Sequence, residues 1–352
     1  MPGTLEGKPL MIRFAGILVG AALVAGCATQ AMGPSPLTPA PSARQLALRR
    51  PISNTNPMFI FRGEPQYVAD VIPAELRPYV AVELFTEVTS PDAGDRYDKF
   101  LTACDSLKIY AFTQVWNGWT PTTIDTSWIE SMFKKHPYYL GPLFAELHGS
   151  HYDYVASCID ISSRYGGYAL NDEYLNGENH MLLNHSSPAL LAAMRAHPDN
   201  YIIVTKQTTP AEYLKGEAIS AGLWICGLAG NWGINPDSWS WWETGRGKLF
   251  GPEGDSREFD PAKCWVTYPE AQVSMALYEA AIAGATVFAI FEHPSYEVAQ
   301  EGTLTPCFRK EILPTLKKIV SDRLIPDRDQ VRKKTKVASV HQESPKRQYG
   351  LI

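Results

Sequence analysis

The sequence predicts a (β/α)8 barrel, a closed ring of parallel strands surrounded by helices. One observation is that short apolar segments alternate with segments of helical periodicity over about 270 residues. The other is that the strand-like segments are almost free of charge but end in acidic or amide side chains. Such side chains are expected where parallel strands bring their C-terminal ends to one face. The chain of 352 residues, 45% of them hydrophobic, can build a core of this size.

Eight apolar segments have the length of buried strands. They are Met58–Phe61, Tyr79–Phe85, Ile109–Val115, Tyr139–Ala145, Gly167–Leu170, Tyr201–Thr205, Gly222–Leu228 and Ala285–Phe291. After the seventh, Gly230, Gly233 and Pro236 are expected to break any strand. The stretch Gly222–Glu243 contains five of the nine tryptophans, which suits stacking on the apolar faces of sugar rings. A tryptophan-rich core is the alternative.

Helical segments follow the strands. They are expected at Tyr67–Leu76, Arg96–Leu107, Tyr152–Tyr165, Pro269–Ala283 and Glu311–Ser321, with further helices beginning near Ser127, Ser187 and Thr209. Ser127 and Glu130 have the spacing of a capping box, and Pro188 fits a first helical position. An open doubly wound sheet is the alternative, but residues 61–64 (FRGE) do not supply its glycine-rich phosphate loop.

The charge distribution argues against a nucleic-acid partner. The net charge is −5, and from Arg309 onward the chain carries 12 Lys and Arg against 5 Asp and Glu, a balance of +7. The remainder therefore carries −12, whereas a nucleic-acid binder needs a basic face. The basic end is expected to be a solvated helix face.

The N-terminus has the pattern of an export signal. Lys8 and Arg13 precede the apolar run Phe14–Gly26, which is too short to span a bilayer as a permanent helix. Its end, LVAGC, resembles a bacterial lipoprotein signal, which implies a lipidated Cys27. An ordinary signal peptide is the alternative, and Met11 is a second candidate start. Residues 1–27 are thus expected to be the signal and the proline-rich residues 28–51 a tether. The protein is expected in the cell envelope, membrane-bound only through its lipid, or secreted.

The sequence gives little support for a cofactor or a metal site. Beyond Cys27 there are five cysteines without CxxC spacing, and Cys104, Cys158 and Cys226 have core patterns. The close histidine pairs, 148/151 and 180/185, lie in expected loops. Neither a GxSxG elbow nor a nucleotide motif is present. We therefore expect no cofactor and no metal.

Candidate functional side chains lie where the expected strands end. They are Glu64, Glu87, Gln114, Trp116, Glu146, Asp172, Glu173, Lys206, Asp237 and Glu292. Acids crowded in one mouth raise one another's pKa, so that one can act as an acid while another acts as a base. Glycoside hydrolysis needs such a pair. Salt bridges or a solvated rim are the alternative for each carboxylate taken alone.

Several stretches resemble glycoside hydrolase family 98. They are RPIS at 50–53, NPM at 56–58, IPAELRPYV at 72–80, residues 136–146, GNWG at 230–233 through DSW at 237–239, GATV at 284–287 through Glu292, and residues 324–338. The likeness covers nearly everything from Arg50 to Ala338. It implies a catalytic domain at 52–338 with the barrel fold, acting within glycan chains with inversion of configuration. Known activities of the family are endo-β-galactosidase and xylanase.

The resemblance also implies roles for single residues. Glu146 takes the position of the general acid, while Asp237 and Glu292 together activate the water. Asp172, Glu173 and Glu243 are the reserve candidates for the catalytic carboxylates and otherwise belong to the substrate-binding set. Expected substrate contacts are Gln114, Trp116, Lys206, Asn231 and Trp232. Family members usually continue into a β-sandwich, so residues 339–352 are expected to be a tail where that domain begins. The alternatives are a non-catalytic glycan-binding surface lipoprotein on the same barrel, and an inactive truncated fragment.

Overall fold

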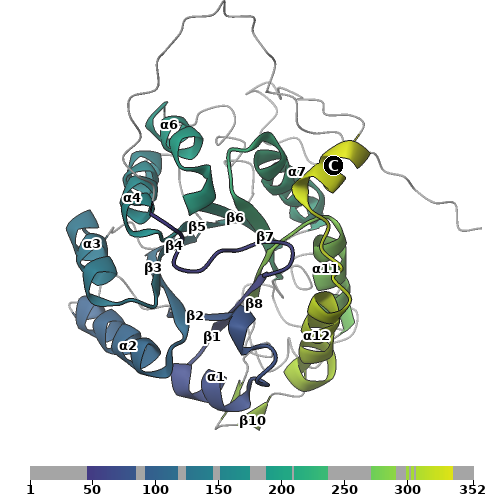
Figure 1. The fold of residues 1–352 in the computed structure, drawn as a ribbon, viewed down its shortest axis with the longest axis horizontal. Coiled ribbons are helices and arrows are strands. Elements are labelled where there is room, and N and C mark those ends of the chain that lie inside the picture. Colours follow the sequence, from purple (N-terminus) through teal and green to yellow (C-terminus); the bar gives the residue numbers. More distant parts are fainter. Residues whose placement is uncertain are drawn as a thin grey trace, which may run out of the picture.

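The structure is a computed structural model. It describes residues 46–84, 92–117, 124–145, 151–174, 188–207, 210–236, 271–290, 299–300, 303–304 and 307–335. Eight parallel strands close into a barrel in sequence order (Figure 1). They are β1 (Met58–Arg62), β2 (Val80–Leu84), β3 (Tyr110–Asn117), β4 (Tyr139–Ala145), β5 (Ala169–Tyr174), β6 (Tyr201–Gln207), β7 (Asn231–Pro236) and β8 (Val287–Ile290). The predicted fold class is confirmed.

Helices surround the ring of strands (Figure 1). They are α1 (Pro65–Val71), α2 (Ala93–Leu107), α3 (Thr126–Lys135), α4 (Tyr152–Tyr165), α6 (Pro188–Ala196), α7 (Pro210–Cys226), α11 (Ala271–Ile282), α12 (Leu313–Ser321) and α13 (Arg328–Lys334). Shorter elements are the 3-10 turns η1 (Arg77–Tyr79) and η3 (Pro198–Asn200), the π-helical η5 (Phe308–Ile312), and the antiparallel pair β9 (Ala299–Gln300) and β10 (Thr303–Leu304). Among the described residues, none of these helices combines the length and apolar composition that crossing a bilayer requires.

Two apolar clusters follow from the alternation of side chains along each strand. The larger lies between the strands and the helices and includes Phe59, Val82 and Trp232. The smaller fills the barrel interior and includes Ile60 and Ala81 from the same two first strands. Continuous burial on both faces explains why the strands have almost no charged residues.

The prediction of the seventh strand is wrong. Gly222–Cys226 forms the last turns of α7, and the strand is Asn231–Pro236, within the stretch expected to be a loop. The apolar run has helical spacing, because Ile219, Leu223 and Trp224 are all buried on one side of α7. Glycine at 233 is required within the strand, since a Cβ there would lie 1.9 Å from the carbonyl oxygen of Val287.

The capping box predicted for α3 is also wrong. The helix begins at Thr126, and Asp125 is its N-cap, whose carboxylate accepts from the Ser127 backbone N–H at 2.7 Å. Glu130 instead accepts a hydrogen bond from the Tyr165 hydroxyl at 2.7 Å. By contrast, β4 and α4 have the predicted bounds.

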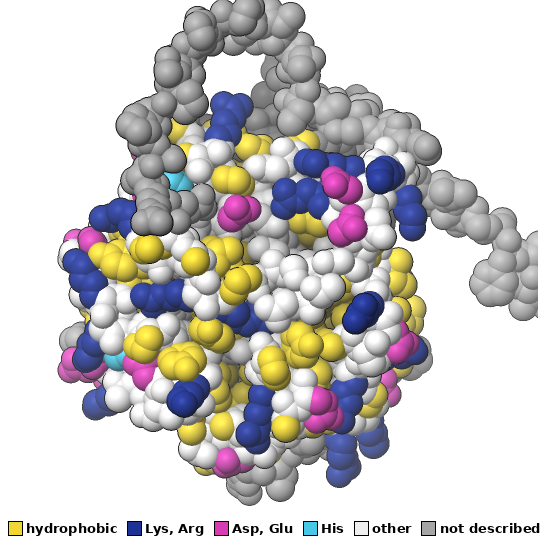
Figure 2. Space-filling view, viewed as in Figure 1, with side chains coloured by type: hydrophobic (Ala, Val, Ile, Leu, Met, Phe, Trp, Pro, Cys, Tyr) yellow, Lys and Arg dark blue, Asp and Glu magenta, His cyan; other side chains and the backbone are white. Residues whose placement is uncertain are grey.

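Residues 46–53 cross the N-terminal end of the barrel, in front of the strands in Figure 1. Arg50 is 3% exposed and donates to the carbonyl of Pro57 at 2.6 Å and to that of Pro78 at 3.2 Å. Tyr168 inside the barrel donates to the Arg50 carbonyl at 2.5 Å. The described end of the expected tether is therefore packed against the barrel. On this face, which Figure 2 shows, basic, acidic and apolar side chains are interspersed.

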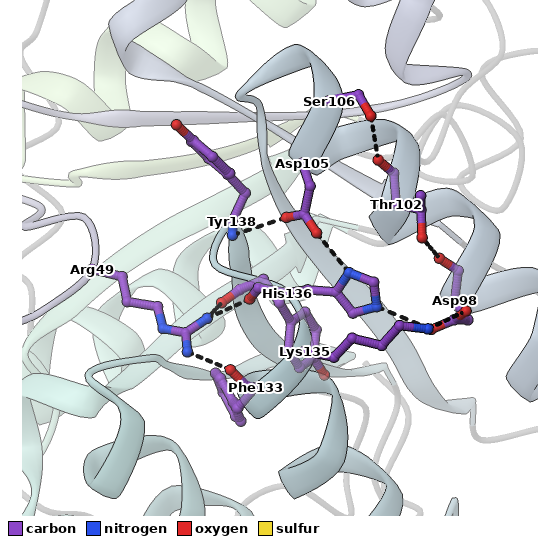
Figure 3. A network of polar contacts seen from close by, with 10 residues as sticks. Arg49, Asp98, Thr102, Asp105, Ser106, Phe133, Lys135, His136 and Tyr138 are labelled. Atoms are coloured by element: carbon purple, nitrogen blue, oxygen red, sulfur yellow. Dashed lines mark hydrogen bonds and ion pairs between the residues drawn. The ribbon is translucent and has the colours of Figure 1, made fainter.

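A second polar network holds the start of β4 against α2 (Figure 3). His136 is 2% exposed, and its two ring nitrogens lie 2.7 Å from Asp105 Oδ2 and 3.0 Å from Asp98 Oδ1. The other oxygen of Asp105 accepts from the Tyr138 backbone N–H at 3.2 Å. The buried imidazole thus ties α2 to the residues that lead into β4.

Candidate active site

A layer of polar side chains closes the barrel interior at the C-terminal ends of its strands. Its members are Arg62, Glu83, Gln114, Asp172, Lys206 and Asn235, called here the polar layer. Five of them stand two residues beyond a residue of the interior cluster, and Asn235 stands two beyond Gly233, which pairs with Val204 and Val287 of that cluster. Alternation therefore turns all six inward. Barrel interiors are usually filled by branched apolar residues, and active sites lie at this end. The polar layer is therefore the floor of the candidate active site.

Nearly all of the polar layer is buried. Glu83, Asp172 and Asn235 are 0% exposed, whereas the Arg62 side chain is 30% exposed. Arg62 donates through Nε to Glu83 Oε1, which joins β1 to β2. Buried charges need such partners, because burial removes their hydration.

A second contact joins β5 to β7. Asn235 Nδ2 on β7 donates to Asp172 Oδ2 on β5 at 2.7 Å, although β6 lies between the two strands. Two cations, Arg62 and Lys206, and two acids, Glu83 and Asp172, belong to the polar layer. Their formal charges cancel, so this floor offers hydrogen bonds to a ligand without a strong field of one sign.

The three expected catalytic residues come within two residues of the ends of described strands, but they lie outside the described residues. Glu146 succeeds Ala145 at the end of β4, and Asp237 succeeds Pro236 at the end of β7. Glu292 comes two residues after the end of β8. Glu87, Glu243 and Cys27 are also outside the described part.

Other predicted residues fall in different places. Gln114, Asp172 and Lys206 belong to the polar layer. Trp116 and Glu173 lie on β3 and β5, but their side chains are outside the described part. Glu64 is exposed at the N-cap of α1.

The structure does not bring Asn231 and Trp232 to the mouth. Both stand at the start of β7, at the opposite end of the barrel. Asn231 Oδ1 accepts from Thr286 Oγ1 at 2.8 Å, and Trp232 is fully buried in the core between strands and helices. Because the Trp232 indole is part of this core, it cannot stack on a ligand at the mouth of the barrel.

Glu217 is a partly buried acid outside the barrel interior. It lies on α7 and accepts from Gln207 Nε2 at 2.5 Å. Burial raises the pKa of Glu217 to about 7, the Gln207 hydrogen bond opposes this shift, and Glu279 adds to it. Within the described ranges, no three His, Cys, Asp or Glu side chains are grouped as metal ligands.

Three comparisons bear on this barrel. The sequence profile of glycosyl hydrolase family 98 matches residues 46–326. A blood-group-substance endo-1,4-beta-galactosidase of Clostridium perfringens is 25% identical over 343 residues, which cover 87% of this chain and 42% of that protein. The chain thus spans less than half the length of this relative.

Solved structures show the same fold. The catalytic module of a family 98 glycoside hydrolase from Streptococcus pneumoniae TIGR4, in complex with the H-disaccharide blood group antigen, superposes with a TM-score of 0.71 at 23% identity. The same module with the LewisY pentasaccharide gives 0.71 at 21% identity. Each match covers 82% of this chain and 56% of the other.

Proposed function

The chain belongs to glycosyl hydrolase family 98, and we propose on this premise that it hydrolyses internal β-glycosidic bonds in a complex glycan with inversion of configuration. The observation that carries the proposal is the polar layer, a charge-balanced floor of buried hydrogen-bonding groups at the catalytic end of the barrel. A neutral, hydroxyl-rich ligand suits such a floor better than an anion does.

The order of the strands is compatible with carboxyl groups that flank the scissile bond. In the closed ring β7 and β8 are neighbours, whereas β4 stands opposite β8. An acid that follows β4 and two carboxylates that follow β7 and β8 therefore start from opposite sides of the mouth. Inversion requires an acid and a base on opposite faces of the sugar, with carboxyl groups roughly 6.5–9.5 Å apart to leave room for water.

The proposed mechanism assigns one role to each carboxyl group. Glu146 protonates the glycosidic oxygen as the bond to the leaving sugar breaks. Asp237 and Glu292 accept a proton from the water that attacks the anomeric carbon from the other side. Gln114 and Lys206 in the polar layer are proposed to bind sugar hydroxyls.

The substrate class is the finer part of the proposal. The Clostridium perfringens relative is named for its action on blood-group substance, which favours a galactoside of that type over xylan. We also propose export with a lipid on Cys27. Retention of radiolabelled lipid by the wild-type protein and its loss in Cys27→Ser tests the lipid site independently of hydrolysis.

Product analysis tests the function. The purified protein is incubated separately with a type 2 blood-group glycan and with xylan, and the first anomer released is identified by NMR. We expect an oligosaccharide of inverted configuration from the blood-group glycan. A retained configuration would exclude the inverting mechanism, and binding without product would favour a glycan-binding role.

Glu146→Gln tests the acid, because glutamine keeps the shape of the side chain but has no proton to transfer. We expect kcat to fall by about a hundredfold or more with an unchanged melting temperature. Glu75→Gln, which changes an exposed acid between α1 and η1, is the control and is expected to keep full activity. Equal activity of both variants would remove Glu146 from the mechanism.

A further inference from the structure

The contact between Asp172 and Asn235 has no structural necessity in a barrel of this kind. The strands are already joined by main-chain pairing, β5 to β6 and β6 to β7. An apolar side chain could fill the inward position of Asp172, as Leu170 does two residues earlier on β5. Two fully buried polar side chains that hydrogen bond across β6 therefore call for another explanation.

The chemistry of the two groups fixes the orientation of the amide. A carboxylate oxygen only accepts, so the Asn235 group that faces Asp172 is the amide nitrogen. Asn235 Oδ1 is buried and makes no hydrogen bond within the described part of the chain. The described polar contact of the Asn235 side chain is therefore the one with Asp172.

The position of Asn235 connects this contact to the reaction. Asn235 is the penultimate residue of β7, and the proposed base Asp237 follows Pro236 directly along the chain. At 236, proline fixes its own φ and restricts the conformation of Asn235. A hydrogen bond that holds Asn235 in place therefore also restrains Pro236, the residue that Asp237 follows in the chain.

We propose that Asp172 and Asn235 form a positioning pair, in which the buried hydrogen bond between them fixes the end of β7 and thereby the place of the Asp237 carboxylate. The proposal rests on the proposed hydrolysis. It gives Asp172 a role other than substrate binding, and it adds Asn235, which the residue pattern does not single out.

An exchange of the two side chains tests the pair. Asn235→Asp places two carboxylates against each other, and we expect kcat to fall at least about tenfold, since small displacements of reacting groups are costly. Asp172→Asn in the same chain restores an amide–carboxylate pair in the reverse direction. We expect the double variant to recover most of the lost kcat.

The pH profile separates positioning from a merely structural effect. The acidic limb of kcat/KM reports the ionisation of the base in the free enzyme. We expect the pKa of this acidic limb to shift in Asn235→Asp and to return toward the wild-type value in the double variant. The matched control is Glu217→Gln, which changes the amide–carboxylate pair of Gln207 and Glu217 outside the barrel interior and should leave kcat within about twofold.

Each remaining outcome decides the matter. No recovery in a cooperatively folded double variant, or an unchanged acidic limb with only a lowered melting temperature, overturns the pair. If Asn235→Asp does not fold, Asn235→Ala is measured instead. An unchanged kcat and an unchanged pH profile of Asn235→Ala would also overturn the pair. A wild-type protein without hydrolytic activity defeats the proposed function itself, whereas an active wild type with unaffected variants defeats only the pair.

Discussion

Arg49 Nη2 lies 2.6 Å from the carbonyl oxygen of Phe133 in the last turn of α3. The same guanidinium donates to the carbonyls of His136 at 2.6 Å, Tyr139 at 2.9 Å and Tyr165, the last residue of α4, at 3.0 Å. The last carbonyls of a helix have no partners within it and carry a partial negative charge. One arginine ahead of the first strand therefore ties two helix ends to the base of the barrel.

Arg49→Ala should destabilise the protein by about 2–4 kcal/mol, because it removes several hydrogen bonds from a charged donor. Arg49→Lys keeps the charge but loses the fork geometry, so an intermediate loss is expected. Denaturant unfolding measures both. Arg309→Ala, at an exposed site of η5, is the control and should change stability by less than about 0.5 kcal/mol. Equal stability of Arg49→Ala and the control would show that these contacts contribute nothing.

Asp98 predicts a loss of stability in acid. A hydrogen bond from Lys135, and a second from His136, hold the pKa of Asp98 below its ordinary value. The contribution is therefore complete above the unfolded pKa, about 4, and is lost as the pH falls through the lower folded pKa. Asp98→Asn should cost about 1 kcal/mol at pH 7, and its difference from wild type should shrink below pH 4.

Melting temperatures between pH 7 and pH 3 measure this difference. Asp95→Asn changes an exposed acid of the same helix and serves as the control. A difference between Asp98→Asn and wild type that stays constant over the whole range would contradict the assignment.

The regular part of the fold follows from local patterns. Continuous apolar runs such as Tyr139–Ala145 predict buried strands because both faces of each strand are covered. The pattern fails at β7, where Gly233 and Pro236 have the composition of a loop. Long-range packing decides there: only glycine fits against the backbone of Val287, and proline at the strand end disturbs little.

The wrong position of the seventh strand also affects the predicted site. The sequence pattern predicts Trp232 in a loop after the seventh strand, where an indole could contact a sugar, whereas its position within β7 turns it toward the helices. The ends of apolar runs predict that Asp172 and Lys206 lie toward the ends of strands, and they lie in β5 and β6. Glu83 and Asn235 were missed because one lies inside a strand and the other in loop-like sequence. A signal for Glu83 was available, since a lone acid within the apolar run VAVEL implies a buried partner.

Gly233→Ala tests the register of β7 directly. A Cβ at this position would lie 1.9 Å from the Val287 carbonyl oxygen, so the strands must separate or the chain must misfold. We expect a loss of more than about 3 kcal/mol or no soluble protein. Gly94→Ala, where the nearest atom is Trp128 Nε1 at 3.3 Å, is the control in a helix and should be nearly neutral. Wild-type stability of Gly233→Ala would contradict the close approach of β7 and β8.

Glu217 predicts the opposite pH dependence to Asp98. Burial raises the folded pKa of Glu217 to about 7, so the folded state keeps its proton while the unfolded state has already released it. Stability therefore declines as the pH rises from the unfolded pKa, about 4.5, to the folded one, and is constant above. Glu217→Gln keeps an oxygen that accepts from Gln207 but does not ionise. Its stability relative to wild type should rise by about 1–2 kcal/mol between pH 5 and pH 8, less than full burial would give because the side chain is partly exposed. Urea unfolding at the two pH values measures this, and a parallel pH dependence of both proteins would show that Glu217 ionises freely in the fold.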